Sequence, residues 1–334
     1  MRKLFVCPST LTPGYTSYSP IALKHLFNGR KVSPYLDFNF EEGNCKEIIL
    51  NMGQTPLPGL QEKFSGVLDG NHIRLTNANE QGTYILKPIP WEYSLSEYKQ
   101  MPINEHLTMQ IASQVYGIQT AKNGLCFTKN GKPVYITRRF DVNTDSSKNA
   151  QEDFAVLNGK NEQSDGLYYK YEGSYANIAE KIKQCIPAWM IAMERFFRLV
   201  VFNYLYGNGG AHLKNVSVQR INNECVLAPA YDLLNTSAHL NENIFGLKDG
   251  LSSCTEKSEV YIQTGYPCKL DFIRFGQLIG LKEKRMETIL NPFMDIPSNV
   301  FALIEHSFLN NKMKRNYLRI IIERNFRFTR KPNL

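Results

Sequence analysis

Four polar residues of this 334-residue chain stand in an order that suits phosphate and metal-ion chemistry. Lys87 ends the apolar run TYILK, and Glu105 lies near the start of the periodic stretch PINEHLTMQIASQVYG. Asn215 follows in the glycine-rich stretch YGNGGAHLKN, and Asp232 comes soon afterwards in APAYDLL. A side-chain amide followed by a carboxylate can hold a magnesium ion that bridges nucleotide phosphates. The sequence therefore predicts a site for a nucleotide and Mg²⁺.

Each of these residues also has an ordinary interpretation when it is taken alone. A lysine at a strand end is usually solvated, and a glutamate in the first turn of a helix stabilises the helix N-terminus. The order strand lysine, helix glutamate, loop asparagine and metal-binding aspartate, however, matches the residue set of protein kinases. The combination predicts a kinase-like site that uses ATP and Mg²⁺.

The first two of these residues must be positioned by short strands and one helix. The segments HIRLTN, GTYILKPI and NGLCFTKNGKPVYITRRF are rich in β-branched and aromatic residues, and Asn130-Gly131 predicts a hairpin turn. Apolar residues recur every four positions from Leu107 to Val115, and Gly117 ends the run, so one amphipathic helix is predicted there. Residues 1–141 are therefore expected to form a β-rich lobe.

The rest of the chain changes character after a polar stretch. Residues 142–170 have little periodicity, which is typical of a loop, and we place a linker at 142–155. From about residue 174 onward the apolar spacing is mainly helical. The predicted helical segments are 175–186, 187–207, 269–281, 282–296, 297–309 and 311–326. These patterns predict an α+β, two-lobed architecture, with a helical lobe over 156–334 and a cleft between the lobes.

Bulk composition bounds the class of protein. No apolar run approaches the roughly 18 residues of a membrane helix, and the N-terminal apolar run is too short for a signal peptide, so we expect cytoplasmic residence. The seven cysteines are scattered without a C-x-x-C pair, so neither a disulfide framework nor a zinc site is expected. The net charge of +8 is compatible with an anionic partner, but the densest basic cluster, residues 312–330, is typical of a solvated helix face.

Several short motifs together resemble one family. PGLQEK, YILKPI, NEHLTMQIAS, ITRRFD, QEDF, FNYLYGNGGAHLKN and LAPAYDLLNT are similar to the successive motifs of the HipA-type serine/threonine kinase toxins, over about residues 50–240. The combination of HLKN with APAYD is more specific than a general kinase signature. The chain is more similar to the short form of the family, HipT, in which an N-terminal subdomain is a separate small protein. The resemblance implies the two-lobed kinase-like fold of that family.

The resemblance also implies roles for matching positions. The positions implied to contact the nucleotide are Pro58, Gly59, Leu60, Gln61, Glu62, Lys63, Lys87, Arg138, Arg139, Phe140, His212, Lys214 and Tyr231. In this set, Pro58 to Lys63 would cover the phosphates, and Lys87, partnered by Glu105 or a nearby acid, would reach them. The segment Arg138 to Phe140 would be a hinge offering backbone bonds to adenine. The catalytic loop would bring His212 and Asn215 beside the phosphates, with Asn215 and Asp232 as the Mg²⁺ ligands.

Two positions depart from the family pattern. The family places an aspartate, the general base, five residues before the metal-binding asparagine, and this chain has Gly210 there. Loss of such a base typically lowers the rate by roughly 10²–10⁴. The glycine pair also permits positive φ, where an aspartate would be strained. In the phosphate loop, Pro56 and Pro58 occupy the region of the family's regulatory serine, with Thr55 the nearest hydroxyl.

Three functions are compatible with this pattern. The first is a HipA-like serine/threonine kinase toxin of a toxin–antitoxin system, which phosphorylates a translation protein of the aminoacyl-tRNA synthetase class and is nearly inactive because of Gly210. The second is a non-catalytic nucleotide-binding pseudokinase or scaffold subunit of a DNA-bound antitoxin complex. The third is a basic module that reaches DNA only through a partner. The implied partners are a small protein like the N-terminal subdomain and a helix-turn-helix antitoxin. Whether Gly210 is natural or engineered stays open.

Overall fold

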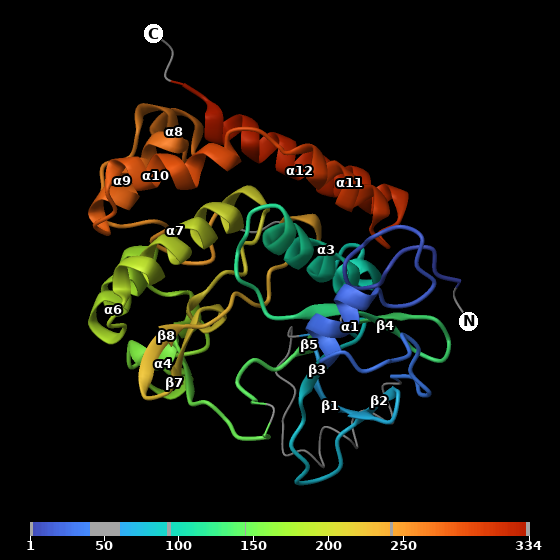
Figure 1. The fold of residues 1–334 in the computed structure, drawn as a ribbon. Helices are drawn as coiled ribbons and strands as arrows, with labels where there is room; N and C mark the ends of the chain where they lie inside the picture. The colour runs from blue at the N-terminus through green and yellow to red at the C-terminus, as the bar shows by residue number, and fades with distance from the viewer. Residues whose placement is uncertain (1–2, 41–60, 92–94, 144, 241–242, 332–334) are drawn as a thin grey trace. The chain divides into compact units, whose positions relative to one another are not determined.

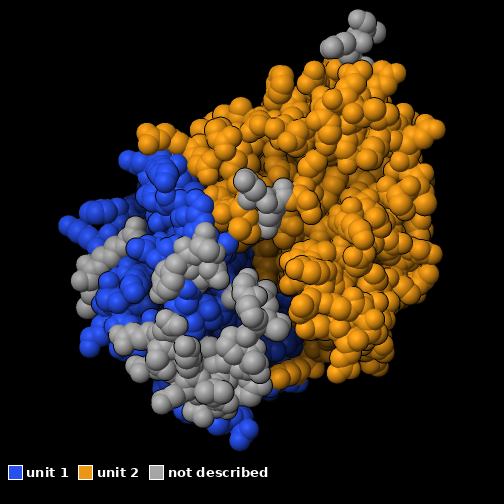
Figure 2. All heavy atoms as spheres, turned by 180° about the vertical axis from the view of Figure 1, so that it is seen from behind, with its two compact units in different colours: residues 1–111, 121–147, 302–314 blue, residues 112–120, 148–301, 315–334 orange. Residues whose placement is uncertain are grey.

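The computed structural model describes residues 3–40, 61–91, 95–143, 145–240 and 243–331. The chain divides into two compact units, coloured separately in Figure 2. Unit 1 comprises residues 1–111, 121–147 and 302–314, and unit 2 comprises residues 112–120, 148–301 and 315–334. The break between residues 147 and 148 falls inside the predicted linker. The short segments 112–120 and 302–314, however, belong to the opposite unit from the one that a single linker implies.

Unit 1 contains a five-stranded antiparallel sheet. Its elements are α1 (Pro20–Phe27), β1 (Phe64–Asp69), β2 (His72–Leu75), β3 (Tyr84–Lys87), η1 (Tyr98–Gln100), the first part of α3 (Met101–Gln114), β4 (Asn123–Phe127) and β5 (Pro133–Arg138). The strand order is β2-β1-β3-β5-β4. The hairpin predicted at Asn130-Gly131 joins β4 to β5, and Gly131 has a φ of +82°. The β-rich character predicted for this part of the chain is confirmed.

Helix α1 was not predicted from the sequence. Ser19 caps it by accepting a hydrogen bond from the N–H of Ala22, Pro20 occupies its first turn, and Asn28 ends it in a left-handed conformation. Leu26 and Phe27 of this helix belong to the same buried cluster as the strand residues Phe64 and Leu86. Figure 1 shows α1 beside the strands of this sheet. A helix of eight residues has little stability of its own, so this packing must hold it in place.

Unit 2 is mainly helical. Its elements are β6 (Gln151–Asp153), α4 (Phe154–Leu157), α5 (Glu162–Asp165), η2 (Tyr169–Tyr171), α6 (Tyr175–Cys185), α7 (Trp189–Leu205), η3 (Leu213–Asn215), β7 (Ser217–Ile221), β8 (Glu224–Leu227), η4 (Thr236–Ala238), α8 (Glu259–Thr264), α9 (Lys269–Leu278), α10 (Glu283–Leu290) and η5 (Asn291–Phe293). Helices α11 (Ser298–His306) and α12 (Asn311–Thr329) complete the chain. Each helix predicted from residue 175 onward is present, so the α+β class is confirmed.

Unit 2 also holds a small sheet, and its first strand, β6, lies where the sequence indicated a loop. Strand β6 pairs with β7, and β7 pairs with β8, both antiparallel. Asp153 ends β6 and caps α4, because its carboxylate accepts the N–H of Val156. Polar residues at these positions concealed a strand of only three residues, which tertiary pairing stabilises.

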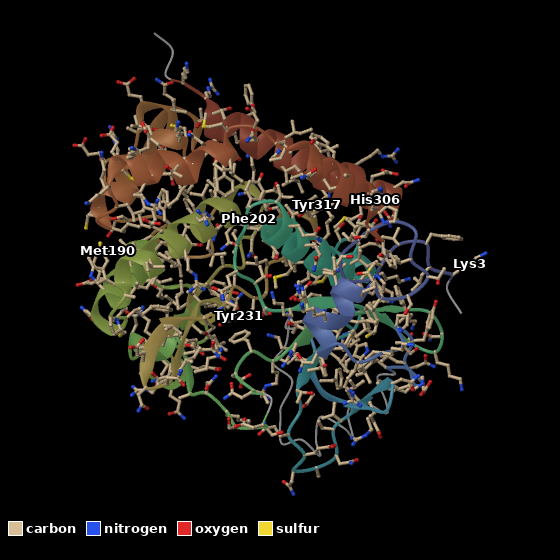
Figure 3. The ribbon with its side chains drawn as sticks, in the orientation of Figure 1. Lys3, Met190, Phe202, Tyr231, His306 and Tyr317 are labelled. Carbon is tan, nitrogen blue, oxygen red and sulfur yellow. The ribbon has the colours of Figure 1, made fainter. Side chains whose placement is uncertain are left out.

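Helix α7 forms the centre of the unit 2 core. Met190, in its first turn, is 62% exposed and points outward, whereas Phe202 near its other end is buried (Figure 3). Phe202 stacks on Tyr206 at 4.3 Å between ring centroids, and Phe197 stacks on Phe275 of α9. This burial fixes the end of α7, from which the glycine-rich loop leaves.

The basic residues of α12 are only partly a solvated face. Lys312 is mostly exposed, as predicted. Arg324 instead donates to the carbonyl of Tyr204 at 2.8 Å and to the hydroxyl of Ser237. The guanidinium of Arg327 lies 3.6 Å from the ring centre of Tyr266. Part of this basic cluster therefore packs against other residues of unit 2.

Two expectations about composition agree with the described residues. The six cysteines among them carry no disulfide, and Cys7, Cys126 and Cys268 are buried. No helix in the described ranges is both long and apolar enough to cross a membrane.

Candidate active site

Unit 1 holds a buried ion pair between the strand lysine and the helix glutamate. Lys87 ends β3, and its Nζ lies 2.6 Å from Oε1 of Glu105 in the second turn of α3. The two side chains are only 4% and 2% exposed. The ammonium also lies 5.3 Å from the ring centre of Tyr135, which is the register partner of Lys87 on β5. The pairing expected between these two residues is present.

The predicted phosphate loop is only partly within the described residues. Pro58, Gly59 and Leu60 lie outside them, as do Thr55 and Pro56. Gln61, Glu62 and Lys63 are described, and they precede β1 directly. The side-chain amide of Gln61 donates to the carbonyl of Pro88 at 2.9 Å, next to Lys87. This bond ties the start of β1 to the end of β3, the strand that carries the buried lysine.

The predicted hinge residues have their amide groups engaged inside unit 1. The N–H of Arg138 donates to Lys122, and the N–H of Arg139 donates to Thr83. The Arg139 guanidinium pairs with Asp141, and this bond raises the pKa of the arginine. Backbone donors from the two arginines are therefore already used. An adenine contact from the backbone of this segment would have to use other groups, such as its carbonyls, and the hinge role stays a prediction.

Unit 2 holds the glycine-rich loop in a fixed shape. Gly207 has a φ of +66°, and a Cβ there would lie 2.7 Å from the side chain of Asn235. The hydroxyl of Thr236 accepts the N–H of Gly209 and donates to the carbonyl of Gly207. A residue at position 207 thus has both a conformational and a steric reason to be glycine.

Gly210 has neither reason. Its φ lies outside the left-handed region, so the strain expected for an aspartate at this position is absent, and that expectation is wrong. A Cβ at Gly210 would lie 3.4 Å from Oδ1 of Asn208 and 3.4 Å from a methyl group of Thr236. These are ordinary van der Waals distances. The loop therefore has room for a Cβ at position 210.

The amide of Asn215 is oriented by the same loop. Its Nδ2 donates to the carbonyl of Gly210 at 2.8 Å, and its backbone N–H donates to His212. With the amide nitrogen held in this way, the side-chain oxygen is the atom that remains to face a ligand. His212 packs its ring edge-to-face against Tyr171, at 5.1 Å between centroids. Lys214 is exposed.

Asp232 has a strained backbone beside this loop. Its φ of +56° places it in the left-handed region, which is uncommon for a residue other than glycine. The preceding residue, Tyr231, donates its hydroxyl hydrogen to the carbonyl of Lys214 at 2.8 Å. Because a phenol has only one such hydrogen, Ser217 must be the donor in its 2.5 Å contact with Tyr231. Burial raises the pKa of Tyr231, so the phenol stays protonated and keeps this bond.

A hydrogen bond joins the two chain segments that carry the predicted metal ligands. Tyr231 adjoins Asp232 and Lys214 adjoins Asn215, so the tyrosine bond ties the two ligand-bearing segments together. An amide oxygen and a carboxylate are oxygen ligands of the kind Mg²⁺ uses together with substrate phosphates. No cluster of three or more metal-binding side chains occurs within the described parts of the chain. A two-ligand site of this kind fits a magnesium–nucleotide complex better than a protein-only metal centre.

Sequence reasoning missed the residues that shape the loop from a distance. Gly246 is one of them, because a Cβ there would lie 2.5–2.6 Å from backbone atoms of Ala211. Tyr175 is another, since its hydroxyl donates to the carbonyl of Ala211 at 3.0 Å. The third is Thr236, described above. Their roles depend on contacts far along the chain, and only the close approach at a glycine leaves any trace in the sequence.

Comparison with known proteins gives a consistent assignment. Residues 55–300 match the family described as the HipA-like C-terminal domain. A Haemophilus influenzae protein named "Putative kinase" is 26% identical over 332 residues, which cover 92% of this chain and 91% of that protein. "Putative kinase Y4mE" of Sinorhizobium fredii is 26% identical over 189 residues, covering 55% of this chain and 43% of that protein.

Two solved structures share the fold. One is the HipA of Shewanella oneidensis, in a complex with HipB and operator DNA, with a TM-score of 0.63 and 16% identity over 87% of this chain and 71% of that chain. The other is the Helicobacter pylori proinflammatory kinase CtkA, with a TM-score of 0.50 and 17% identity over 79% of this chain and 93% of that chain. The chain therefore has the HipA-like, kinase-like α+β fold.

The buried ion pair predicts a large and specific loss of stability. In Glu105→Gln, the Lys87 ammonium keeps its burial but loses its counter-ion, so the free energy of unfolding should fall by about 3–5 kcal/mol. The double variant Lys87→Met/Glu105→Leu should recover much of this loss, because no unpaired charge remains. Urea denaturation measures both. The exposed pair of Lys248 and Glu172 supplies the control, since Glu172→Gln should change the stability by less than about 0.5 kcal/mol. A Glu105→Gln variant as stable as the parent would contradict the role of the pair.

Gly246 and Gly210 are expected to differ in how well they tolerate substitution by alanine. Gly246→Ala forces a methyl group against the backbone of Ala211 and should lower the free energy of unfolding by about 1–3 kcal/mol. Gly210→Ala meets only ordinary contacts and should change it by less than about 0.5 kcal/mol. Thermal unfolding followed by circular dichroism tests the pair. Equal losses in the two variants would show that the loop geometry is different from that described.

Proposed function

Because the chain belongs to the HipA-like C-terminal domain family, we propose that it is a serine/threonine protein kinase by descent, of the toxin–antitoxin type. Its cofactors are ATP and Mg²⁺. Its substrate is a hydroxyl group of a protein of the translation apparatus, such as an aminoacyl-tRNA synthetase. The chain as written binds the nucleotide but transfers the phosphoryl group poorly.

One observation carries this proposal: the left-handed backbone of Asp232 beside the fixed amide of Asn215. Strained residues of this kind cost about 1–3 kcal/mol and persist where the surrounding structure holds them for function. The Tyr231 hydroxyl supplies that hold through the carbonyl of Lys214. The arrangement supports a two-ligand Mg²⁺ site in unit 2.

Each unit, taken by itself, holds groups suited to one part of the proposed chemistry. In unit 1, Lys87 offers a cation whose position is fixed by Glu105, so a phosphate oxygen can be bound without a large loss of side-chain entropy. In unit 2, Asn215 and Asp232 offer oxygen ligands, and Mg²⁺ would neutralise charge on the phosphates when it is bound. His212 and Lys214 are placed on the same loop as Asn215.

The weak step is proton removal from the acceptor hydroxyl. The segment from Gly207 to Asn215 contains no carboxylate, and Gly210 stands where the family has its base. General-base catalysis contributes roughly 10²–10⁴ in rate, so the nucleotide machinery remains while most of the turnover is lost.

The same absence favours a second candidate function. A chain that keeps the nucleotide site without the base would act as a non-catalytic pseudokinase or scaffold subunit. Its partners would be the same in either case: a small protein like the N-terminal subdomain of longer relatives and a helix-turn-helix antitoxin. The antitoxin is supported by the Shewanella HipA, which was solved with HipB and operator DNA. Contact with DNA would then come through the antitoxin.

ATP with Mg²⁺ is expected to stabilise the protein in either case. A ligand at one hundred times its dissociation constant raises the free energy of unfolding by about 2.7 kcal/mol. Asp232→Asn should remove most of this effect, because asparagine tolerates the left-handed backbone but lacks the charge. Asp249→Asn, at an exposed aspartate of unit 2, is the matched control and should bind as the parent does. No thermal shift at millimolar ATP–Mg²⁺ would count against both candidate functions.

Gly210→Asp is expected to restore phosphoryl transfer. The position accepts a side chain without backbone strain, so the whole gain from a base, roughly 3–5 kcal/mol of transition-state free energy, is available. The measurement is the transfer of labelled γ-phosphate to proteins of a bacterial lysate, together with growth after induction. Gly210→Asn is the control, because it has nearly the same shape without a basic carboxylate. If Gly210→Asp binds ATP but labels no more protein than Gly210→Asn, the pseudokinase function is correct and the kinase function is wrong.

A further inference from the structure

A small pocket of about 190 Å³ lies within unit 2, apart from the residues assigned to the nucleotide. Three segments line it: residues 117–119 after α3, one face of α7 with Arg195, Arg198 and Leu199, and the end of β8 with the residues that follow it, namely Leu227, Ala228 and Ala230. Arg195, Arg198 and Leu199 share a face because they are three and four residues apart on one helix. The pocket volume is below the ~300–1,000 Å³ of sites for drug-sized ligands, so it suits one small group.

The pocket contains two positive charges and no lining carboxylate. Neither Arg195 nor Arg198 forms an ion pair with any residue that the structure describes. The nearest acid along α7, Glu194, is held by two bonds to Arg285. Arg198 and Arg285 both lower the pKa of Glu194, with the Arg285 hydrogen bonds the larger cause. The charge of Glu194 is thus already compensated on the α10 side.

Arg195 is poorly satisfied for a group of its kind. Its one hydrogen bond to a residue that the structure describes runs from Nη2 to the carbonyl of Ala228 at 3.3 Å, which is long for a guanidinium donor. A guanidinium has five donors, so most of them remain to be used. Burial lowers the pKa of Arg195, which indicates a partly desolvated charge without a compensating anion. Such a group gains strongly from an oxyanion that binds to its fork.

The remaining walls of the pocket indicate which chemical group accompanies the anion. Ile118, Leu199 and Leu227 are apolar, Ala228 and Ala230 present only methyl groups and backbone, and Gln119 is the one polar uncharged side chain in the lining. Apolar walls weaken the competition from water and strengthen a charge-assisted hydrogen bond. A bare, strongly hydrated ion would leave these walls uncovered, whereas a short alkyl group would cover them.

We propose that this pocket is a binding site for a small organic oxyanion, a carboxylate or phosphate group on a short apolar chain, and that its occupancy orders residues 227–230. The anion would bind Arg195 and Arg198 together. The segment it contacts is already tied to the other wall, since the N–H of Ala230 donates to the carbonyl of Gln119 at 2.8 Å. Residues 227–230 are followed directly by Tyr231 and Asp232. The lining residue Ala230 is therefore two residues before the left-handed Asp232 along the chain.

The test is a titration with butyrate and with propyl phosphate at constant ionic strength, with butanol as the uncharged control. Arginine side-chain Nε–H signals followed by NMR report binding directly. We expect saturable shifts for the two anions and none for butanol. Arg195→Gln should weaken binding by about tenfold or more, as expected for the loss of a charge-assisted bond. Arg198→Gln should weaken it in the same direction, and Arg220→Gln, at an exposed arginine of unit 2, should leave it unchanged.

Hydrogen exchange gives a second readout that does not depend on kinase activity. The amides of Ala228 and Ala230 should exchange more slowly when either anion is bound, and this slowing should be absent in Arg198→Gln. Shifts that do not saturate, or that are equal in Arg195→Gln, Arg198→Gln and Arg220→Gln, would overturn the site. If Arg195→Gln does not fold, anion binding by Arg198→Gln is compared with that by Arg220→Gln. Saturable binding with unchanged exchange at Ala228 and Ala230 would overturn the ordering of the segment.

Discussion

The hydroxyl group of Tyr231 is the contact on which the candidate site in unit 2 depends. It donates to Lys214 and accepts from Ser217, so it joins the segment of Asp232 to the loop of Asn215 and to strand β7. The same segment is fixed on its other side by the bond between Ala230 and Gln119. These bonds offset the cost of a left-handed aspartate, about 1–3 kcal/mol. Without them, the aspartate would relax and the two oxygen ligands would no longer be held on bonded segments.

The glycines around the loop differ in what the fold demands of them. Gly207 combines a positive φ with a close side-chain neighbour, and Gly246 lies against the backbone of Ala211. Gly210 has neither constraint, so the fold does not explain the absence of a carboxylate there. Backbone strain and close contacts therefore do not decide which residue stands at position 210. The loop orients Asn215 through the carbonyl of Gly210.

The sequence predicted the long helices, the main strands of the unit 1 sheet and the pairing of chemical groups, but it missed some of the short elements. Helices such as α7 and α12 carry enough apolar spacing to be recognised, and the hairpin turn at Asn130-Gly131 has a strong local signal. Helix α1 and strand β6 have eight and three residues, and distant partners stabilise them. The contact of Thr236 with the glycine-rich loop is invisible for the same reason. The backbone N–H groups of Arg138 and Arg139 give a further example. Both donate hydrogen bonds within unit 1, and the sequence alone cannot say which backbone groups are already engaged in this way.

The energetic cost of the site argues that it binds a ligand. A buried ion pair such as that of Lys87 and Glu105 adds little net stability, because desolvation of two charges cancels most of their attraction. Apolar residues of the same size would hold β3 and α3 together at least as well. The left-handed Asp232 likewise costs free energy without improving the core. Both features fall on residues whose order matches a kinase, and both place a charged or oxygen-bearing group in a fixed position. The proposed nucleotide with its magnesium ion would use these groups, which would account for a fold that carries their cost.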